Sequence, residues 1–146
     1  MSAISFRSAD RRLQVPGKTG LKEFIQFLFK KEKKTLNSLT YVFCSDGYLL
    51  QMNRDFLQHD FYTDIITFGL SEPGYPIEAE VYISLDRVKD NAKTHNTAYT
   101  EEILRVIFHG ALHLCGYADK KKREITLMRE KEDHYLRLFE KKQADG

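Results

Sequence analysis

The spacing of apolar residues along the chain separates helical segments from strands. Apolar side chains at helical spacing predict a first helix between Thr19, its expected cap, and the lysine-rich run at residues 30–34, where cations favour the helix dipole. Two short strands are expected before it, at residues 3–6 and 11–15. Three later segments have the composition or the alternation of strands, and they are residues 38–45, 62–70 and 78–85.

Helices are expected around these strands. Residues 48–57 follow a cap at Ser45 or Asp46, and residues 86–93 follow a cap at Ser84. A further helix opens at Thr100, and the last one covers residues 123–139, with five apolar residues on one side: Ile125, Met128, Tyr135, Leu136 and Phe139. Strands interleaved with helices predict a single α+β domain over residues 1–146, with one mixed sheet of about four strands packed with about five helices.

Residues 103–115 form the most informative helix. Nine of these thirteen residues are apolar, which predicts a helix surrounded by protein on nearly all sides. Three of the exceptions, Arg105, His109 and His113, are spaced by four and therefore form one polar stripe along the helix. This spacing lets the two imidazoles approach one metal ion.

Asp119 is the expected third ligand of this ion. Gly116 is well placed to end the helix in a left-handed conformation, after which the chain can turn back toward the two histidines. Three protein ligands and a fourth position left to water define an open, zinc-like catalytic site on a central buried helix. The alternative interpretation is a pair of core histidines with satisfied hydrogen bonds beside a surface aspartate.

Gly110 is evidence on which class of metal hydrolase the sequence encodes. Zinc proteases of the H-E-x-x-H type have a glutamate immediately after the first histidine, and this chain has Gly110 there. A peptidase would lack its proton acceptor, although a bound metal would still lower the pKa of water toward about 7. The glycine has a second interpretation, which is close packing of the helix.

The string HGALHLCGYAD resembles the signature of the YbeY family of bacterial metal-dependent endoribonucleases, which is H-G-x-L-H-L-x-G-Y followed by a third metal ligand. The resemblance extends upstream through Asn53 to the stretch TDIITF at residues 63–68 and to the strand at residues 80–83. It continues downstream to Met128 and Glu132, and it covers about residues 40 to 135.

This resemblance implies metal ligation by His109, His113 and Asp119, with one zinc ion per chain. It also implies an endoribonuclease that prefers single strands and acts in ribosomal RNA maturation, at the 3′ end of 16S rRNA, and in ribosome quality control. The implied partners are ribosomal RNA and the small ribosomal subunit, and no DNA. The third ligand of the family is usually histidine, and the carboxylate of Asp119 makes manganese or another divalent ion more competitive.

A second departure from the family is Leu57, which stands where the family usually has an arginine. Arg54 lies one turn earlier on the same predicted helix and is a candidate to supply the guanidinium, with an exposed surface arginine as the alternative. The cations at residues 120–123 border the proposed site and are interpreted either as RNA contacts or as a solvated loop. His59 is a candidate to face the substrate.

Charge and composition restrict the function only weakly. The chain has 23 Lys and Arg against 21 Asp and Glu, a net charge of +2, so any nucleic-acid contact depends on local clusters. No apolar stretch has signal-peptide or membrane-spanning length, which predicts a cytoplasmic protein with no membrane partner. Three hypotheses remain: a metal-dependent endoribonuclease, a non-catalytic RNA-binding ribosome-assembly factor with a structural metal, and another metal hydrolase, against which Gly110 argues.

Overall fold

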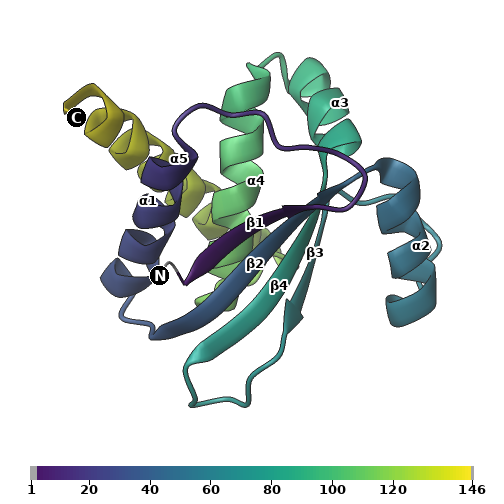
Figure 1. Ribbon diagram of the computed structural model, residues 1–146, viewed down its shortest axis with the longest axis horizontal. Helices are drawn as coiled ribbons and strands as arrows, with labels where there is room; N and C mark the ends of the chain where they lie inside the picture. The colour runs from purple at the N-terminus through teal and green to yellow at the C-terminus, as the bar shows by residue number, and fades with distance from the viewer. Residues whose placement is uncertain (1–2, 146) are drawn as a thin grey trace.

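The computed structural model describes residues 3–145 and contains one mixed sheet (Figure 1). Its strands lie in the order β1 (Ile4–Ser8), β2 (Leu36–Cys44), β4 (Ile77–Ser84) and β3 (Ile65–Gly69). The first three are parallel to one another, and β3 is antiparallel to β4. The expected α+β fold with a single mixed sheet of four strands is confirmed.

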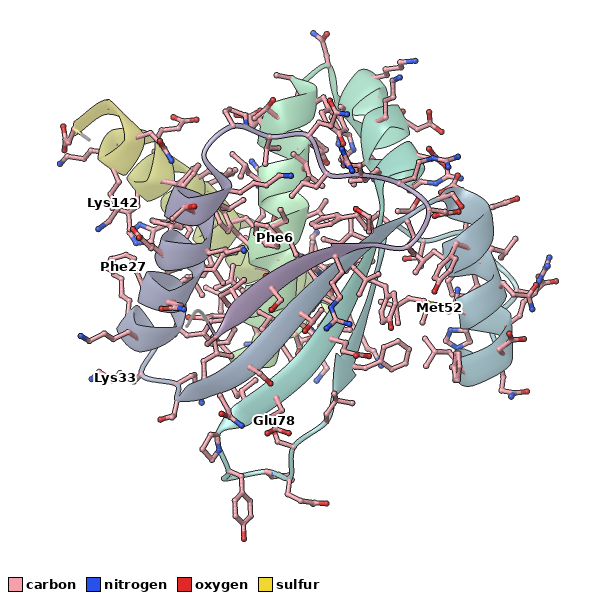
Figure 2. All side chains as sticks on the ribbon, viewed as in Figure 1. Phe6, Phe27, Lys33, Met52, Glu78 and Lys142 are labelled. Atoms are coloured by element: carbon pink, nitrogen blue, oxygen red, sulfur yellow. The ribbon has the colours of Figure 1, made fainter. Side chains whose placement is uncertain are left out.

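Helices cover both faces of this sheet. Five occur in the described residues: α1 (Lys18–Lys31), α2 (Asp46–Leu57), α3 (Leu85–His95), α4 (Tyr99–Leu114) and α5 (Lys122–Asp145). α4 is central, since it packs against β3 and β4 and also against α1, α3 and α5. The end of α5 lies along α1, where Lys142 Nζ is 4.1 Å from the centre of the Phe27 ring (Figure 2). None of these five helices is both long and apolar enough to cross a membrane.

The position of α2 follows from the alternation of side chains in β3. Ile65 packs against the main core, whereas its neighbour Ile66 belongs to a separate small cluster with Cys44 and Leu49. Successive side chains of a strand point to opposite faces, so the cluster that contains Leu49 of α2 lies on the face opposite α4. Met52 of α2 packs against the same cluster (Figure 2).

α4 is buried as its composition predicts. Nine of its residues are buried, while Arg105 and His109 are half-buried and His113 is exposed. Gly110 faces the sheet, where an added Cβ would lie 3.1 Å from Ile65 Cδ1 and 3.2 Å from a Val81 methyl group. The glycine therefore permits close helix-to-sheet packing, and it leaves no space for the glutamate of an H-E-x-x-H motif.

Two expectations near the N-terminus are wrong. Residues 11–15 form no strand, because the chain has to cross from the end of β1 to the start of α1, and it does so as an irregular loop with Leu13 buried (Figure 1). Thr19 does not cap α1. The helix begins at Lys18, after Gly17 with a left-handed φ of 68°, and Gly17 O accepts the bond from Leu21 N.

Other boundaries are confirmed or corrected. Ser45 and Ser84 cap α2 and α3 with their side chains, as expected. α5 continues to Asp145, beyond the expected end at residue 139. β3 begins at Ile65 and not at residue 62, because residues 62–64 form a loop. Ile125 does not join the apolar side of α5: it is 52% exposed, because it lies in the first turn, at the wall of a cavity described below.

Candidate functional site

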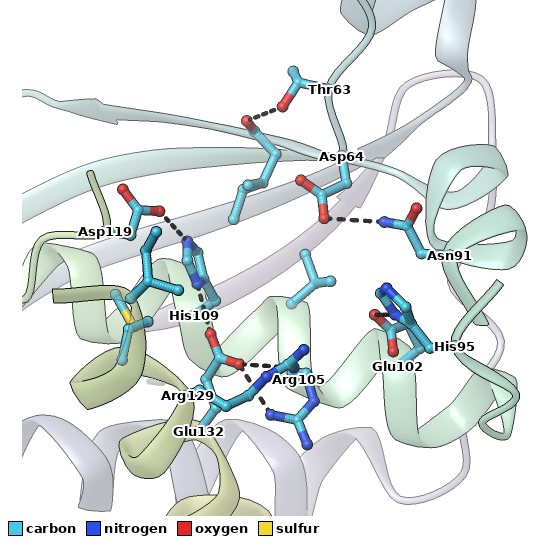
Figure 3. A pocket seen from close by; sticks show the side chains of 14 residues that line it. Thr63, Asp64, Asn91, His95, Glu102, Arg105, His109, Asp119, Arg129 and Glu132 are labelled. Atoms are coloured by element: carbon cyan, nitrogen blue, oxygen red, sulfur yellow. Dashed lines mark hydrogen bonds and ion pairs between the residues drawn. The ribbon is translucent and has the colours of Figure 1, made fainter. Parts of the chain in front are cut away.

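His109 is held between two carboxylates (Figure 3). Its Nδ1 lies 2.7 Å from Glu132 Oε2, and its Nε2 lies 3.1 Å from Asp119 Oδ2. Burial opposes the charged ring, but the hydrogen bond and charge of Glu132, with the charges of Asp119 and Asp64, raise the pKa of His109 above its ordinary value. Bonded to Glu132 through Nδ1, the ring presents Nε2 toward Asp119.

Glu132 fixes this ring from the neighbouring helix. It is 5% exposed, and its second oxygen, Oε1, accepts a hydrogen bond of 3.0 Å from Arg105 Nη1. Arg105 in turn donates from Nη2 to Asp133 at 2.7 Å. A carboxylate behind a histidine is the usual means of setting the tautomer and orientation of a metal-binding imidazole.

His113 lies one turn further along α4. Its Nδ1 is 3.1 Å from the carbonyl oxygen of Tyr117, so a proton on Nδ1 donates to that carbonyl and leaves Nε2 with a free lone pair. The chain turns at Gly116, with a φ of 110°, as the sequence predicted. The hydroxyl of Tyr117 donates to Glu32 Oε1 at 2.8 Å, which ties the turn to the end of α1.

The three predicted ligands line one cavity of about 250 Å³. Its remaining walls come from α2, from the loop after it and from β3: Asn53, Leu57, His59, Phe61, Thr63, Ile65, Ile66 and Thr67. His109 and Asp119 are already adjacent, and His113 shares the cavity with them. Within residues 3–145 no three His, Cys, Asp or Glu side chains are gathered closely enough to form a metal cage. His109 and Asp119 are in contact, and the metal site remains a prediction.

A second cavity of about 460 Å³ lies beside the first and also contains His109 and Asp119 (Figure 3). Asp64 and Arg129 are part of its wall. Burial raises the pKa of Asp64, although the charge of His109 acts in the opposite direction, and Asn91 Nδ2 donates to its carboxylate at 3.4 Å. Asp64 is half-buried, and a carboxylate with a raised pKa beside a candidate metal ligand is a candidate proton acceptor.

The arginine expected from the sequence is not one of those that line a cavity at the candidate site. Arg54 Nε is 2.5 Å from Asp60 Oδ1, and Arg54 does not line either cavity. Arg129 does line the larger cavity; its side chain is 54% exposed, and its Nη1 is 3.6 Å from Glu132 Oε1. Residues 120–123 are exposed beside Asp119, and their side chains make no ion pair among the described residues.

The sequence alone indicates no role for Glu132, Asp64 or Arg129. Glu132 is part of the family resemblance, but a glutamate three residues after an arginine has the pattern of an exposed helical ion pair. One signal was available: Arg105 lies on a helix predicted to be buried, so a buried carboxylate had to be close to it. The sequence contains no information on which acidic residue fills that role.

These features define a small α+β protein whose central helix directs two histidines into one cavity, and one of them, His109, is backed by a buried carboxylate. The family model described as Endoribonuclease YbeY matches residues 4–140, and the chain belongs to this family. The resemblance of the histidine segment is thereby confirmed.

Individual relatives agree with this assignment. A protein named Endoribonuclease YbeY from Cytophaga hutchinsonii is 49% identical, over 92% of this chain and 94% of the relative. One of the same name from Parabacteroides distasonis is 42% identical, over 94% and 96%. The solution structure of a Thermotoga maritima protein is similar with a TM-score of 0.67 and 26% identity, and the match covers 97% of this chain and 92% of that one.

Proposed function

We propose that this chain is a metal-dependent endoribonuclease for single-stranded RNA, with one zinc ion held by His109, His113 and Asp119. The observation that carries the proposal is the position of His109, backed by Glu132 on one nitrogen and 3.1 Å from Asp119 on the other. Two ligand atoms on one tetrahedral ion lie about 3.3 Å apart, so this spacing fits a shared metal. His113 lines the same cavity, and its Nδ1 contact with the Tyr117 carbonyl leaves Nε2 available to the same ion. The name of the relatives supports RNA as the substrate.

A bound zinc ion would supply a water of lowered pKa and would polarise the phosphoryl oxygen. The residues of the chain have separate tasks. Glu132 and the Tyr117 carbonyl orient the two imidazoles, and Asp64 accepts a proton within the larger cavity. Arg129 offers a guanidinium to the phosphate from the wall of that cavity, and this makes it a better placed candidate than Arg54. The carboxylate of Asp119 keeps manganese as an alternative ion.

We further propose that the substrate is ribosomal RNA, cleaved in the cytoplasm during 16S rRNA 3′-end maturation and ribosome quality control, with the small ribosomal subunit as the partner. The support for this finer statement is the family membership and the exposed cations beside Asp119. DNA is not an expected substrate.

Removal and return of the metal test this function. The purified protein is expected to contain about one metal ion per chain, to lose cleavage of single-stranded RNA in a chelator, and to regain it with zinc or manganese. Elemental analysis and a labelled oligonucleotide measure both effects, with DNA of the same sequence as the control. Cleavage that persists after the metal has been removed would contradict the proposal.

A second candidate is a non-catalytic RNA-binding ribosome-assembly factor with a structural metal. It is favoured by Leu57 in the smaller cavity and by the pairing of Arg54 with Asp60 outside it. In that case, removal of the metal is expected to unfold the protein, and RNA is bound without being cut at any metal concentration.

Neutralising the cations after Asp119 is expected to reduce the salt dependence of RNA binding. Each phosphate contact contributes about 0.7 to the slope of log K against log salt for single strands, so Lys120→Gln, Lys121→Gln and Lys122→Gln together should lower it by about 2. The matched control is Lys30→Gln, Lys33→Gln and Lys34→Gln, which removes three exposed lysines in the last turn of α1 and just after it, and the same net charge. Equal slopes for the first variant and the wild type would exclude the RNA contact.

A further inference from the structure

The smaller cavity has two exposed aromatic rings at its wall. His59 and Phe61 stack on each other with their centres 5.0 Å apart and their planes 22° from parallel. Phe61 is 55% exposed, and both rings line the cavity that contains His109, His113 and Asp119. A stacked aromatic pair left open to solvent beside a polar cavity is a surface suited to a flat ligand.

The loop that carries these two rings is held by a hydrogen bond from one buried side chain of α2. Asn53, which is 1% exposed, donates from Nδ2 to the carbonyl oxygen of Phe61 at 2.8 Å. The backbone carbonyl oxygen of Asn53 accepts a hydrogen bond from the backbone N–H of His59 at 3.0 Å. The ion pair of Arg54 with Asp60 ties the residue between the two rings to α2. The rings are therefore held in place before any ligand arrives, which lowers the entropic cost of binding.

The charge around the cavity indicates what kind of flat ligand fits. The exposed cations at residues 120–123 make no ion pair with any residue of the described range 3–145. They directly follow Asp119, which forms another part of the cavity wall. A ligand that covers the rings and reaches these cations has a planar, apolar face and an anionic backbone. Unpaired nucleotides combine both properties, whereas bases inside a duplex keep their faces stacked on one another.

We propose that Phe61 and His59 form a stacking platform for one unpaired nucleobase of the RNA next to the scissile phosphate. This inference rests on the proposed function and adds the subsite that selects single strands. Stacking tolerates any base, because every base has a π face, so the platform selects for an unpaired nucleotide without selecting its identity.

The test measures binding without cleavage. Metal-free, full-length protein is titrated with a single-stranded RNA that contains 2-aminopurine, whose fluorescence is quenched on stacking. Phe61→Ala and Phe61→Leu are expected to weaken binding by about 10-fold and to lose the quenching, because leucine keeps apolar bulk but not the π face. Phe56→Ala is the matched control: Phe56 is 65% exposed on α2, lies edge to face with Phe68 and is not part of the cavity wall. It should bind as the wild type does.

The possible outcomes separate this inference from the proposed function. Quenching and tight binding by a wild-type protein that never cleaves RNA would support the platform and overturn the function. If the wild-type protein cleaves RNA and Phe61→Leu binds RNA as tightly as the wild type does, the platform is overturned and the proposed function stands. A self-association that Phe61→Ala abolishes while RNA binding stays unchanged would also overturn it, since the rings would then cover a second copy of the chain.

Discussion

Replacing His113 with alanine is expected to remove the bound metal and to lower RNA cleavage by a factor on the order of 10³. The fold should survive, because the ring is exposed and its hydrogen bond to the Tyr117 carbonyl lies at the surface. The variant therefore separates loss of a ligand from loss of structure, which His109→Ala does not, since that change also leaves Glu132 without one of its partners. Elemental analysis, an RNA cleavage assay and thermal unfolding of the metal-free protein measure the three properties.

His134→Ala is the matched control. His134 is also a helical histidine, but its Nε2 lies 3.0 Å from Lys31 Nζ, and it is not part of either cavity that contains His109. This variant should retain its metal and its activity. A His113→Ala protein with full metal content and full cleavage would show that His113 is not a ligand.

Replacing Glu132 with alanine is expected to lower the free energy of unfolding by about 3–5 kcal/mol. The change leaves the guanidinium of Arg105, whose side chain is 16% exposed, with Asp133 alone, and it leaves Nδ1 of His109 without its acceptor. Because the ring also loses its orientation, metal affinity should fall by about 10–100-fold. Urea unfolding of the metal-free protein measures the first effect, and metal titration measures the second.

Two variants sharpen this prediction. Asp133→Ala removes the other carboxylate bound to Arg105, but Asp133 is 40% exposed, so a loss of at most about 1 kcal/mol is expected. Glu132→Gln keeps the side-chain volume and an acceptor for His109, and it should retain more stability than alanine while still weakening the metal. Identical urea midpoints for Glu132→Ala and the wild type would mean that the buried network contributes nothing.

The elements that the sequence predicts well have strong periodicity or clear caps. Apolar positions around α4 and serines before α2 and α3 determine local structure almost alone, and the four-residue spacing of Arg105, His109 and His113 places them on one stripe. The adjacency of His109 and Asp119 follows from the same local pattern, since a single turn at Gly116 separates the helix from the carboxylate.

The remaining features depend on contacts between distant segments. Whether residues 11–15 pair as a strand depends on the route of the chain to α1, and the exposure of Ile125 depends on a cavity between α4 and α5. Arg54 was a candidate because of its helical position, but the loop after α2 places Asp60 beside it. Neither the route of a loop nor the partner of a surface cation is encoded in local periodicity.

The ring of His109 depends on Glu132 in α5, and the turn that carries Asp119 depends on Glu32 at the end of α1, through Tyr117. The two histidines and the groups that orient them therefore come from three separate parts of the chain: the end of α1, α4 with the turn after it, and α5. A chain that ends before α5 has both histidines but lacks the carboxylate that orients His109. Truncated copies of the chain that end before Glu132 are therefore expected to be inactive, although they keep both histidines and Asp119.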